Sequence, residues 1–403
     1  MANGNYVSSS IPVSEWKILK GKPYVTVSAK GISNGLSNIP NDGADFGPDT
    51  LLGASSPNQY GPPYTQTSGI QEAFNSLPQK QVVLPTGAGN VVYFSENPTV
   101  FLMPGLFLIN ETIMLPEWGG YNLIGSGRIQ TVLQDNTATG ITVIQQAVPS
   151  GAGNYYAQLN SNISDFSVIG NSSKTSIAGI DLTQPENIPH YDVHDLYIGG
   201  YFAKYHISMD GCEDSHLHDI WLDGTSNYTS IDTSVTAFAN AVVVEYSTSD
   251  GVATLDHIIS SSSTAAIIAT QAQNLYLSDS VIGMISTALV NTAYELPSSN
   301  VMQISVDRVF FNPTGSANQS FLFFYSPSGQ LTISTLSITN SWMGFGPNSS
   351  GQTAIFGGYF TSSANIPFIM TLNLNNDNFN GINYLSLSNL TPTAFILNNV
   401  TNL

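Results

Sequence analysis

A short pattern of apolar and polar positions recurs along the middle of the chain. Apolar and polar residues alternate, an Asp stands at one fixed place and a Gly closes the copy, as at 163–170, 193–199 and 217–224. Such alternation predicts a short strand with one buried face, and the Gly predicts a turn. Looser copies continue to residues 372–376, at spacings of roughly 22 to 35 residues. We therefore expect one structural unit to be stacked many times.

A second set of apolar strands lies between these copies, at 179–182, 206–209, 241–244, 266–269, 321–324 and 354–356. Two or three strands per coil, joined by turns of Gly, Asn, Ser and Asp, are what a parallel β-helix requires, because each coil buries its inward residues on the next. We predict an all-β solenoid of this type over residues 96–403.

The first 95 residues have a different pattern and predict an N-terminal arm and cap over residues 1–95. Residues 1–60 show little periodicity apart from one strand expected near 24–27. A short helix is predicted near 68–77, with Ser68 capping its first turn, Gln71 completing a capping box and Pro78 ending it. Its apolar face would cover the open end of the solenoid and protect the first coil from edge-to-edge aggregation.

Four segments in this part of the chain occur in a characteristic order: 41–45 (NDGAD), 69–73 (GIQEA), 104–107 (PGLF) and 123–127 (LIGSG). In this order they resemble the N-terminal region of the pectin-lyase-like superfamily, which includes pectate-lyase-type repeats and viral tail-spike and tail-fibre proteins. The resemblance implies a right-handed parallel β-helix, and its tail-spike members imply a homotrimer as one oligomeric form. It leaves the reaction open, because the superfamily holds lyases, hydrolases, epimerases and non-enzymatic binders.

Composition excludes several classes of protein. Only 9% of the 403 residues are charged, and the net charge of −18 opposes binding to nucleic acid, which requires a basic surface. No apolar run is long enough to span a membrane, the N-terminus has no signal-peptide pattern, and Cys212 alone cannot form an intrachain disulfide. The segment from Lys17 to Lys30 carries four lysines and predicts either a solvated terminus or an arm for an acidic partner.

The densest polar cluster lies between residues 190 and 223, which hold five of the six histidines. Equivalent positions on adjacent coils stack about 4.8 Å apart, so carboxylates there could pair as a glycoside hydrolase requires. The candidate catalytic residues are Asp192, Asp195, Asp219 and Asp223. Against this reading, the Asn-Thr-Asp, Asp-Asp, Gly-His-Gly and Arg-Ile-Lys signatures of the polygalacturonase-like branch are absent. The alternative is that Asp165, Asp195 and Asp219 are turn residues repeated by geometry.

A lyase site would combine carboxylate-bound Ca²⁺ with a basic residue, and the coils offer Lys174, Lys204 and Arg308. A polyanionic substrate would be repelled by the acidic chain unless calcium bridged the two. Calcium is thus the one cofactor that the sequence leaves open, and no residues are assigned as metal ligands. His216 and His218 point the same way along a strand, which suits either a metal site or an exposed polar ladder.

Binding without catalysis is the third interpretation. Aromatic rings beside carboxylates and amides suit neutral sugars, which combine apolar faces with hydrogen-bonding hydroxyls. The candidate substrate-binding residues are Tyr197, Trp221, His194, His218, Glu213 and Asp214, and a second patch is expected at Trp342, Phe345 and Tyr359. We therefore expect a surface-exposed protein for attachment or glycan recognition, such as a virion spike, a tail-fibre component or a cell-surface adhesin. The alternative is a secreted polysaccharide-degrading hydrolase or lyase.

Overall fold

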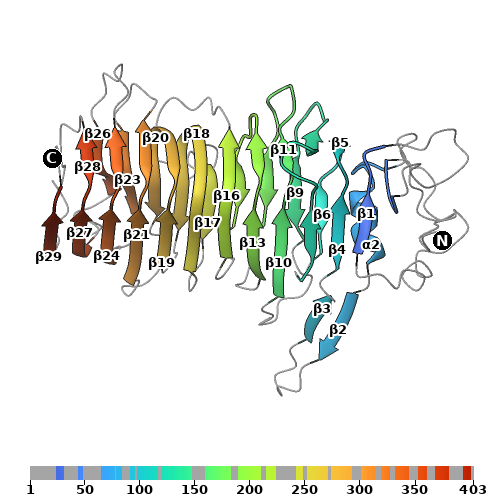
Figure 1. Cartoon of the computed structure of the whole chain (residues 1–403), viewed down its shortest axis with the longest axis horizontal. Coiled ribbons are helices and arrows are strands. Elements are labelled where there is room, and N and C mark those ends of the chain that lie inside the picture. The colour runs from blue at the N-terminus through green and yellow to red at the C-terminus, as the bar shows by residue number, and fades with distance from the viewer. Residues whose placement is uncertain are drawn as a thin grey trace, which may run out of the picture. The chain divides into compact units, whose positions relative to one another are not determined.

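Parallel strands dominate both units of the chain, residues 1–199 and residues 200–403, in the computed structural model (Figure 1). The structure describes residues 24–30, 44–48, 65–77, 79–83, 91–95, 98–116, 120–147, 159–182, 189–209, 215–223, 242–247, 252–270, 274–292, 301–313, 319–326, 332–344, 353–360, 368–380 and 394–400. The predicted boundary at residue 95 stays a prediction.

Three parallel sheets form the first unit, with one strand of each sheet in a full coil. The first sheet contains β1 (Tyr24–Val27), β4 (Thr99–Leu102), β7 (Asn122–Ile124), β10 (Leu159–Ser164) and β13 (Pro189–His194). The second contains β5 (Gly105–Ile109), β8 (Thr131–Asp135), β11 (Ser167–Ile169) and β14 (Tyr197–Gly199). The third contains β6 (Ile113–Leu115), β9 (Thr142–Gln146) and β12 (Ala178–Asp181).

The second unit repeats this arrangement, and some of its strands continue from one sheet into the next. Its first sheet is built from β16 (Ser215–Asp223), β18 (Val252–Thr270), β19 (Asn274–Ser278), β21 (Val301–Asp307), β24 (Thr332–Thr339), β27 (Phe368–Asn375) and β29 (Ala394–Asn398). The second sheet uses the later parts of β16 and β18, then β20 (Val281–Thr292), β22 (Phe310–Pro313), β25 (Trp342–Gly344) and β28 (Asn378–Asn380). The third uses β15 (Tyr205–Ser208), β17 (Val242–Ser247), the ends of β18 and β20, β23 (Gln319–Ser326) and β26 (Thr353–Phe360). The predicted right-handed parallel β-helix is confirmed.

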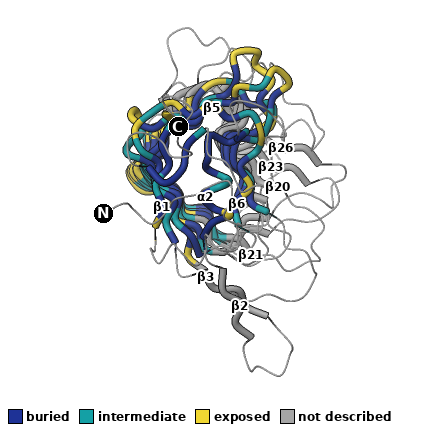
Figure 2. Tube along the Cα trace, turned by 90° about the vertical axis from the view of Figure 1, so that its right-hand side faces the viewer, coloured by how far each residue is buried: buried dark blue, intermediate teal, exposed yellow. Residues whose placement is uncertain are grey.

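Apolar residues stack in columns on the inward side of the coils, because a strand turns every second side chain to the same face. In the first unit such a column runs through Val25, Val100, Leu123, Ile163 and Val193, all fully buried. In the second unit a corresponding column runs through Leu217, Leu255, Leu277, Val306, Ile338 and Leu374. Figure 2 shows buried residues around the interior of the described coils. Each side chain contributes about 2 kcal/mol by leaving water.

A hydrogen-bonded cluster of polar side chains also lies inside the first unit. Gln146 is buried, and its Oε1 accepts hydrogen bonds from the hydroxyls of Tyr121 and Tyr191, each at 2.7 Å. The Gln146 amide nitrogen donates to the carbonyl oxygens of Pro116 and Ala147. Since a buried hydroxyl without a partner costs free energy, Gln146 stabilises two coils at once.

The cap helix α2 covers Ile70–Ser76, within the predicted range, and buries Ile70, Ala73 and Phe74. The predicted cap at Ser68 is wrong, because the Ser68 hydroxyl donates instead to the carbonyl of Leu108 on β5 at 2.8 Å. Gly69 occupies the cap position with a left-handed φ of 88°. The hydroxyl oxygens of Thr65 and Thr67 accept hydrogen bonds from the backbone N–H groups of Gly69 and Gln71 at the start of the helix.

An antiparallel hairpin, β2 (Gln79–Val83) and β3 (Val91–Ser95), follows the helix and was not predicted from the sequence. The predicted helix stop at Pro78 lies outside the described residues. Among the described helical residues, no helix has the length and apolar character to cross a membrane.

Candidate functional site

The Asp of the recurring pattern occupies a left-handed backbone conformation, in agreement with the turn interpretation. In the first unit Asp165 and Asp195 have φ values of 65° and 51°, and in the second unit Asp219 has a φ of 55°. Asp and Asn tolerate this conformation better than most residues, because their short polar side chains bond locally. The catalytic assignment of Asp195 and Asp219 stays a prediction.

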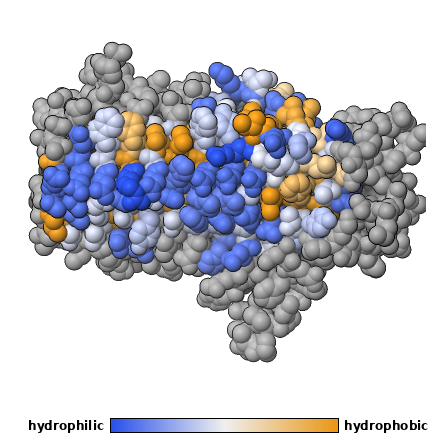
Figure 3. Space-filling model, viewed as in Figure 1, coloured by the Kyte–Doolittle hydropathy of each residue, from blue (hydrophilic) through white to orange (hydrophobic). Residues whose placement is uncertain are grey.

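In the second unit this turn position recurs on every described coil and forms a continuous column of side chains, here called the turn ladder. Its members, all with φ between 47° and 55°, are Asp219, His257, Asp279, Arg308, Asn340, Asn376 and Asn399. The residues are far apart in sequence, and strand pairing alone brings them side by side. The ladder follows the polar outward ends of the first sheet, and Figure 3 shows a hydrophilic band across this unit.

One end of the turn ladder joins a carboxylate to two imidazoles. Asp219 Oδ2 lies 2.9 Å from His218 Nδ1, and Asp219 Oδ1 lies 2.7 Å from His257 Nδ1. The hydrogen bond to His218 is the largest cause of the lowered pKa of Asp219. His216 stacks on His218 with ring centroids 4.4 Å apart, so imidazoles and a carboxylate form one half-buried cluster, of which His257 is the exposed member.

The middle of the turn ladder is a charged clamp centred on Arg308. Its Nε and Nη2 donate to the two carboxylate oxygens of Asp279, both at 2.6 Å, and its Nη1 donates to Asp307. This planar two-point contact is the strong geometry for Arg and a carboxylate. It lowers the pKa of Asp279 and raises that of Arg308. The clamp also explains how an Arg is held at a turn position that favours Asp and Asn.

The rest of the turn ladder is uncharged and is linked by side-chain amides. Asn340 donates to Asp307 at 2.8 Å, Asn376 donates to Asn340 at 3.2 Å, and Asn399 donates to Asn376 at 2.8 Å. Each amide thus uses one donor within the ladder. The remaining amide donors and acceptors lie on exposed residues, where they can hydrogen-bond to hydroxyl groups.

A second outward column runs beside the turn ladder, two residues further along each coil, and is apolar. It consists of Trp221, Ile259, Val281, Phe310 and Trp342, which are paired in register on consecutive strands of the second sheet. We call this column the ridge. Trp221 is 47% exposed and Trp342 is 44% exposed, and the rings of Phe310 and Trp342 stack at a centroid distance of 4.5 Å. Figure 3 shows hydrophobic residues along the border of the hydrophilic band.

In the first unit, a smaller polar network surrounds His194. Its Nδ1 lies 3.0 Å from Asp195 Oδ2, and its Nε2 lies 2.8 Å from the side-chain nitrogen of Asn162. In this arrangement a neutral imidazole donates from Nδ1 and accepts at Nε2. Arg128 approaches Asp195 at 3.6 Å from the other side. Asp192 is exposed on the same face of β13, two residues before His194.

Tyr197 explains one Gly of the sequence pattern. A Cβ at Gly199 would lie 2.6 Å from the Tyr197 ring, so a larger residue there would force this ring to move. The Gly therefore makes room for an aromatic side chain inside a strand, and its backbone does not need a positive φ.

The remaining predicted site residues are not all brought into one place. Trp221 and Asp223 are exposed on β16 within the second unit, while Glu213, Asp214 and Phe345 lie outside the described residues. Tyr359 belongs to β26, and its side chain is outside the described part of the chain. Within each unit, the structure joins His194 to Asp195 and joins His218 to Asp219.

Sequence reasoning missed most of the ridge and the clamp. Ile259, Val281 and Phe310 look like ordinary strand residues, and Arg308 was considered only as a basic residue for a lyase. The signal that could have found them is the spacing: each ridge residue stands two positions after a turn-ladder residue.

Comparison with known proteins finds only distant structural similarity. No family model matches the sequence, and no curated protein matches it. Among solved structures, the chain is similar to the surface protein and adhesin PfbA of Streptococcus pneumoniae, at 9% identity over 96% of this chain and 100% of that one, with a TM-score of 0.39. It is also similar to the A-module of the mannuronan C-5 epimerase AlgE4 of Azotobacter vinelandii, at 12% identity over 83% and 92%, with a TM-score of 0.27.

A third similar structure is ORF18 of Geobacillus virus E2, at 12% identity over 72% of this chain and 58% of that chain, with a TM-score of 0.26. Identities and scores this low carry no functional argument, so function has to be inferred from the site itself.

Proposed function

We propose that this chain is a glycan-recognition protein of the attachment type, which holds an extended sugar chain along the ridge and turn ladder of the second unit. The observation that carries the proposal is a column of paired outward residues beside a column of carboxylates and amides. Trp221, Ile259, Val281 and Trp342 of this column are exposed, and Phe310 is half-buried. Large apolar side chains aligned in the open mark binding surfaces.

The two columns offer the two kinds of contact that a sugar ring needs. Aromatic rings such as Trp221 and Trp342 provide flat apolar faces for the C–H groups of a pyranose. Carboxylates and amides in the turn ladder accept from and donate to hydroxyls. Because coils repeat every 4.8 Å or so, a linear polysaccharide can meet a similar pair of columns along several of its rings.

A hydrolase or lyase is the weaker candidate. A glycosidase needs a carboxylic acid with a raised pKa next to the substrate, whereas hydrogen bonds from His218 and His257 lower the pKa of Asp219. Among the described carboxyls of the second unit, a raised pKa belongs to Asp377, whose side chain is buried. The proposal of recognition places the protein on a cell or virion surface, with a polysaccharide as its partner.

Truncating the ridge tests the proposal. We expect Trp221→Ala and Trp342→Ala each to weaken binding to the best ligand of a glycan panel by about tenfold, because each removes a stacking surface of about 1 kcal/mol or more. Binding is measured by calorimetry, and thermal unfolding verifies that each variant is folded.

Tyr24→Ala is the matched control, since Tyr24 is an equally exposed aromatic residue, 46% accessible, in the first unit. Its binding should match the wild type. Unchanged affinity in both Trp variants would refute the ridge as the binding surface. Release of reducing ends or unsaturated products that stops in Asp219→Asn would support the enzyme alternative instead.

A further inference from the structure

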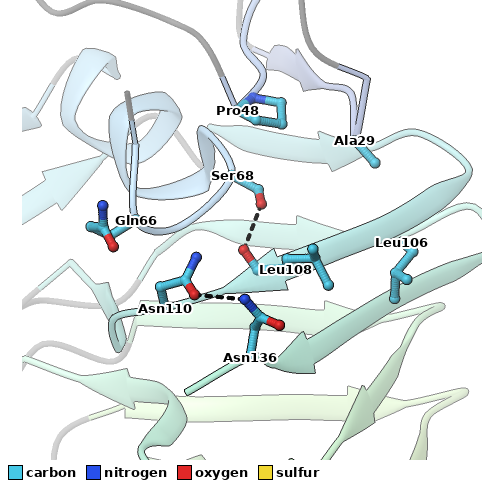
Figure 4. A pocket seen from close by; sticks show the side chains of 8 residues that line it. All are labelled: Ala29, Pro48, Gln66, Ser68, Leu106, Leu108, Asn110 and Asn136. Atoms are coloured by element: carbon cyan, nitrogen blue, oxygen red, sulfur yellow. Dashed lines mark hydrogen bonds between the residues drawn. The ribbon is translucent and has the colours of Figure 1, made fainter. Parts of the chain in front are cut away.

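A separate pocket of about 430 Å³ lies in the first unit, on the outward face of β5 (Figure 4). It is lined by Ala29, Pro48, Gln66, Ser68, Leu106, Leu108, Asn110 and Asn136. Its volume falls within the range of small-molecule sites. The pocket contains no residue of the ridge or turn ladder, so it is independent of the proposed function.

The floor of the pocket is apolar in a place where a strand normally presents polar residues. Leu106 and Leu108 both point outward from β5 and are 50% and 42% exposed, respectively. Two exposed leucines on alternate positions of one strand leave apolar surface in water, which is unfavourable unless a ligand covers it. Ala29 and Pro48 extend the same apolar lining (Figure 4).

The polar edge of the pocket includes Gln66 and two further side-chain amides, Asn110 and Asn136, which directly follow the neighbouring strands β5 and β8. Asn136 Nδ2 donates to Asn110 Oδ1 at 2.9 Å, as Figure 4 shows. This bond uses one donor and one acceptor and leaves the Asn136 carbonyl oxygen and the Asn110 amide nitrogen for a ligand. The Ser68 hydroxyl donates to the Leu108 carbonyl, so its oxygen keeps capacity only to accept.

None of the described residues that line the pocket has a charged side chain. A charged ligand would lose its hydration here without a counter-charge, whereas a neutral ligand would not. The site therefore matches a group that joins a small apolar end to one donor and one acceptor. An acetamido group has this composition: a methyl group for the leucines, an N–H for the Asn136 carbonyl oxygen and a C=O for the Asn110 amide.

We propose that this pocket binds the acetamido group of an N-acetylated sugar. Leu106 and Leu108 contact its methyl group, and the Asn110–Asn136 pair binds its amide. The pocket recognises a single sugar residue or the end of a sugar chain, while the ridge holds several consecutive sugar residues.

The test is titration of the full chain with N-acetylglucosamine, glucose and glucosamine, followed by saturation-transfer NMR and calorimetry. We expect saturable millimolar binding of N-acetylglucosamine, with glucose and glucosamine at least about tenfold weaker because they lack the acetamido group. Mass spectrometry first verifies that Asn110, which begins an Asn-Glu-Thr sequon, carries no glycan.

Asn136→Ala and Leu108→Ala should each weaken N-acetylglucosamine binding by about tenfold, since they remove the acceptor or the apolar floor. Met114→Ala is the control, because Met114 is an exposed apolar residue on neighbouring β6 and does not line the pocket. Trp221→Ala should also bind normally, which separates this pocket from the ridge. Equal binding of glucose, absence of saturable binding to about 50 mM, or unchanged affinity in Asn136→Ala would each overturn the proposal.

Discussion

Replacing Gln146 with Leu is expected to lower the free energy of unfolding of the first unit by about 4 kcal/mol. Leu has a similar size, so the loss comes from hydrogen bonds and not from a cavity. The hydroxyls of Tyr121 and Tyr191 would both lose their 2.7 Å acceptor in the interior, and the Pro116 carbonyl would lose its donor. Chemical denaturation followed by circular dichroism measures the change.

Gln145→Leu is the matched control, because Gln145 is the adjacent residue of β9 and points to the outer side. It should change stability by less than about 0.5 kcal/mol. Adding Tyr121→Phe and Tyr191→Phe to Gln146→Leu should restore much of the loss, since no buried hydroxyl then lacks a partner. A Gln146→Leu protein as stable as the control would contradict a stabilising role of the buried cluster. No recovery in the triple variant would contradict the assignment of the loss to unpaired tyrosine hydroxyls.

Replacing Asp377 with Ser should remove a pH dependence of stability from the second unit. Asp377 is almost fully buried, and this burial raises its pKa from 3.8 to about 6. The folded protein therefore keeps a proton that the unfolded chain releases between these pH values. The contribution to stability is complete below pH 4 and is lost as the pH rises through about 6.

The free energy of unfolding of Asp377→Ser minus that of the wild type should rise by about 3 kcal/mol as the pH increases from 3 to 8. Ser is the natural substitute, because Ser280 and Ser341 stand at the equivalent position of other coils. There each hydroxyl accepts a backbone N–H from the preceding coil and donates to a carbonyl of its own coil. Asp377 likewise accepts the N–H groups of Ser341 and Asn375, each at 2.9 Å.

Urea titrations at a series of pH values measure this difference. Ser341→Ala is the control, since it removes a hydroxyl from the same column without changing any titratable group. It should lower stability by a similar amount at every pH. A difference between Asp377→Ser and the wild type that stays constant from pH 3 to pH 8 would contradict the assignment of the pH dependence to this carboxyl.

Both of these residues show why the sequence was a poor guide to the polar interior. Gln146 follows another Gln, and Asp377 follows two Asn residues, so both look like surface positions. Their burial depends on which way a strand or turn faces after the coils stack. The start of the cap helix depends on tertiary structure in the same way. Ser68 fits a capping pattern, but its hydroxyl donates to the backbone carbonyl of Leu108, forty residues away.

The sequence predicted the types of position in the candidate site, but not which residues form it together. The recurring Asp indicated a turn, and Trp221, a candidate substrate-binding residue, is exposed. The ridge, however, depends on the register between coils, because Ile259, Val281 and Phe310 form one column only when the strands pair as observed. Loops of unequal length separate the coils, so counting along the sequence does not give that register.

The sequence by itself determined the β-helix of this protein. Its alternation of apolar and polar residues specifies which face of each strand is buried, and its recurring Asp and Asn residues mark most of the left-handed turns, while His257 and Arg308 occupy two others. Only the tertiary structure decided which turns lie next to one another, which residues of neighbouring strands form the ridge, and which polar groups are enclosed. These features arise from contacts between coils, and the free energy of such contacts depends on residues that are tens of positions apart.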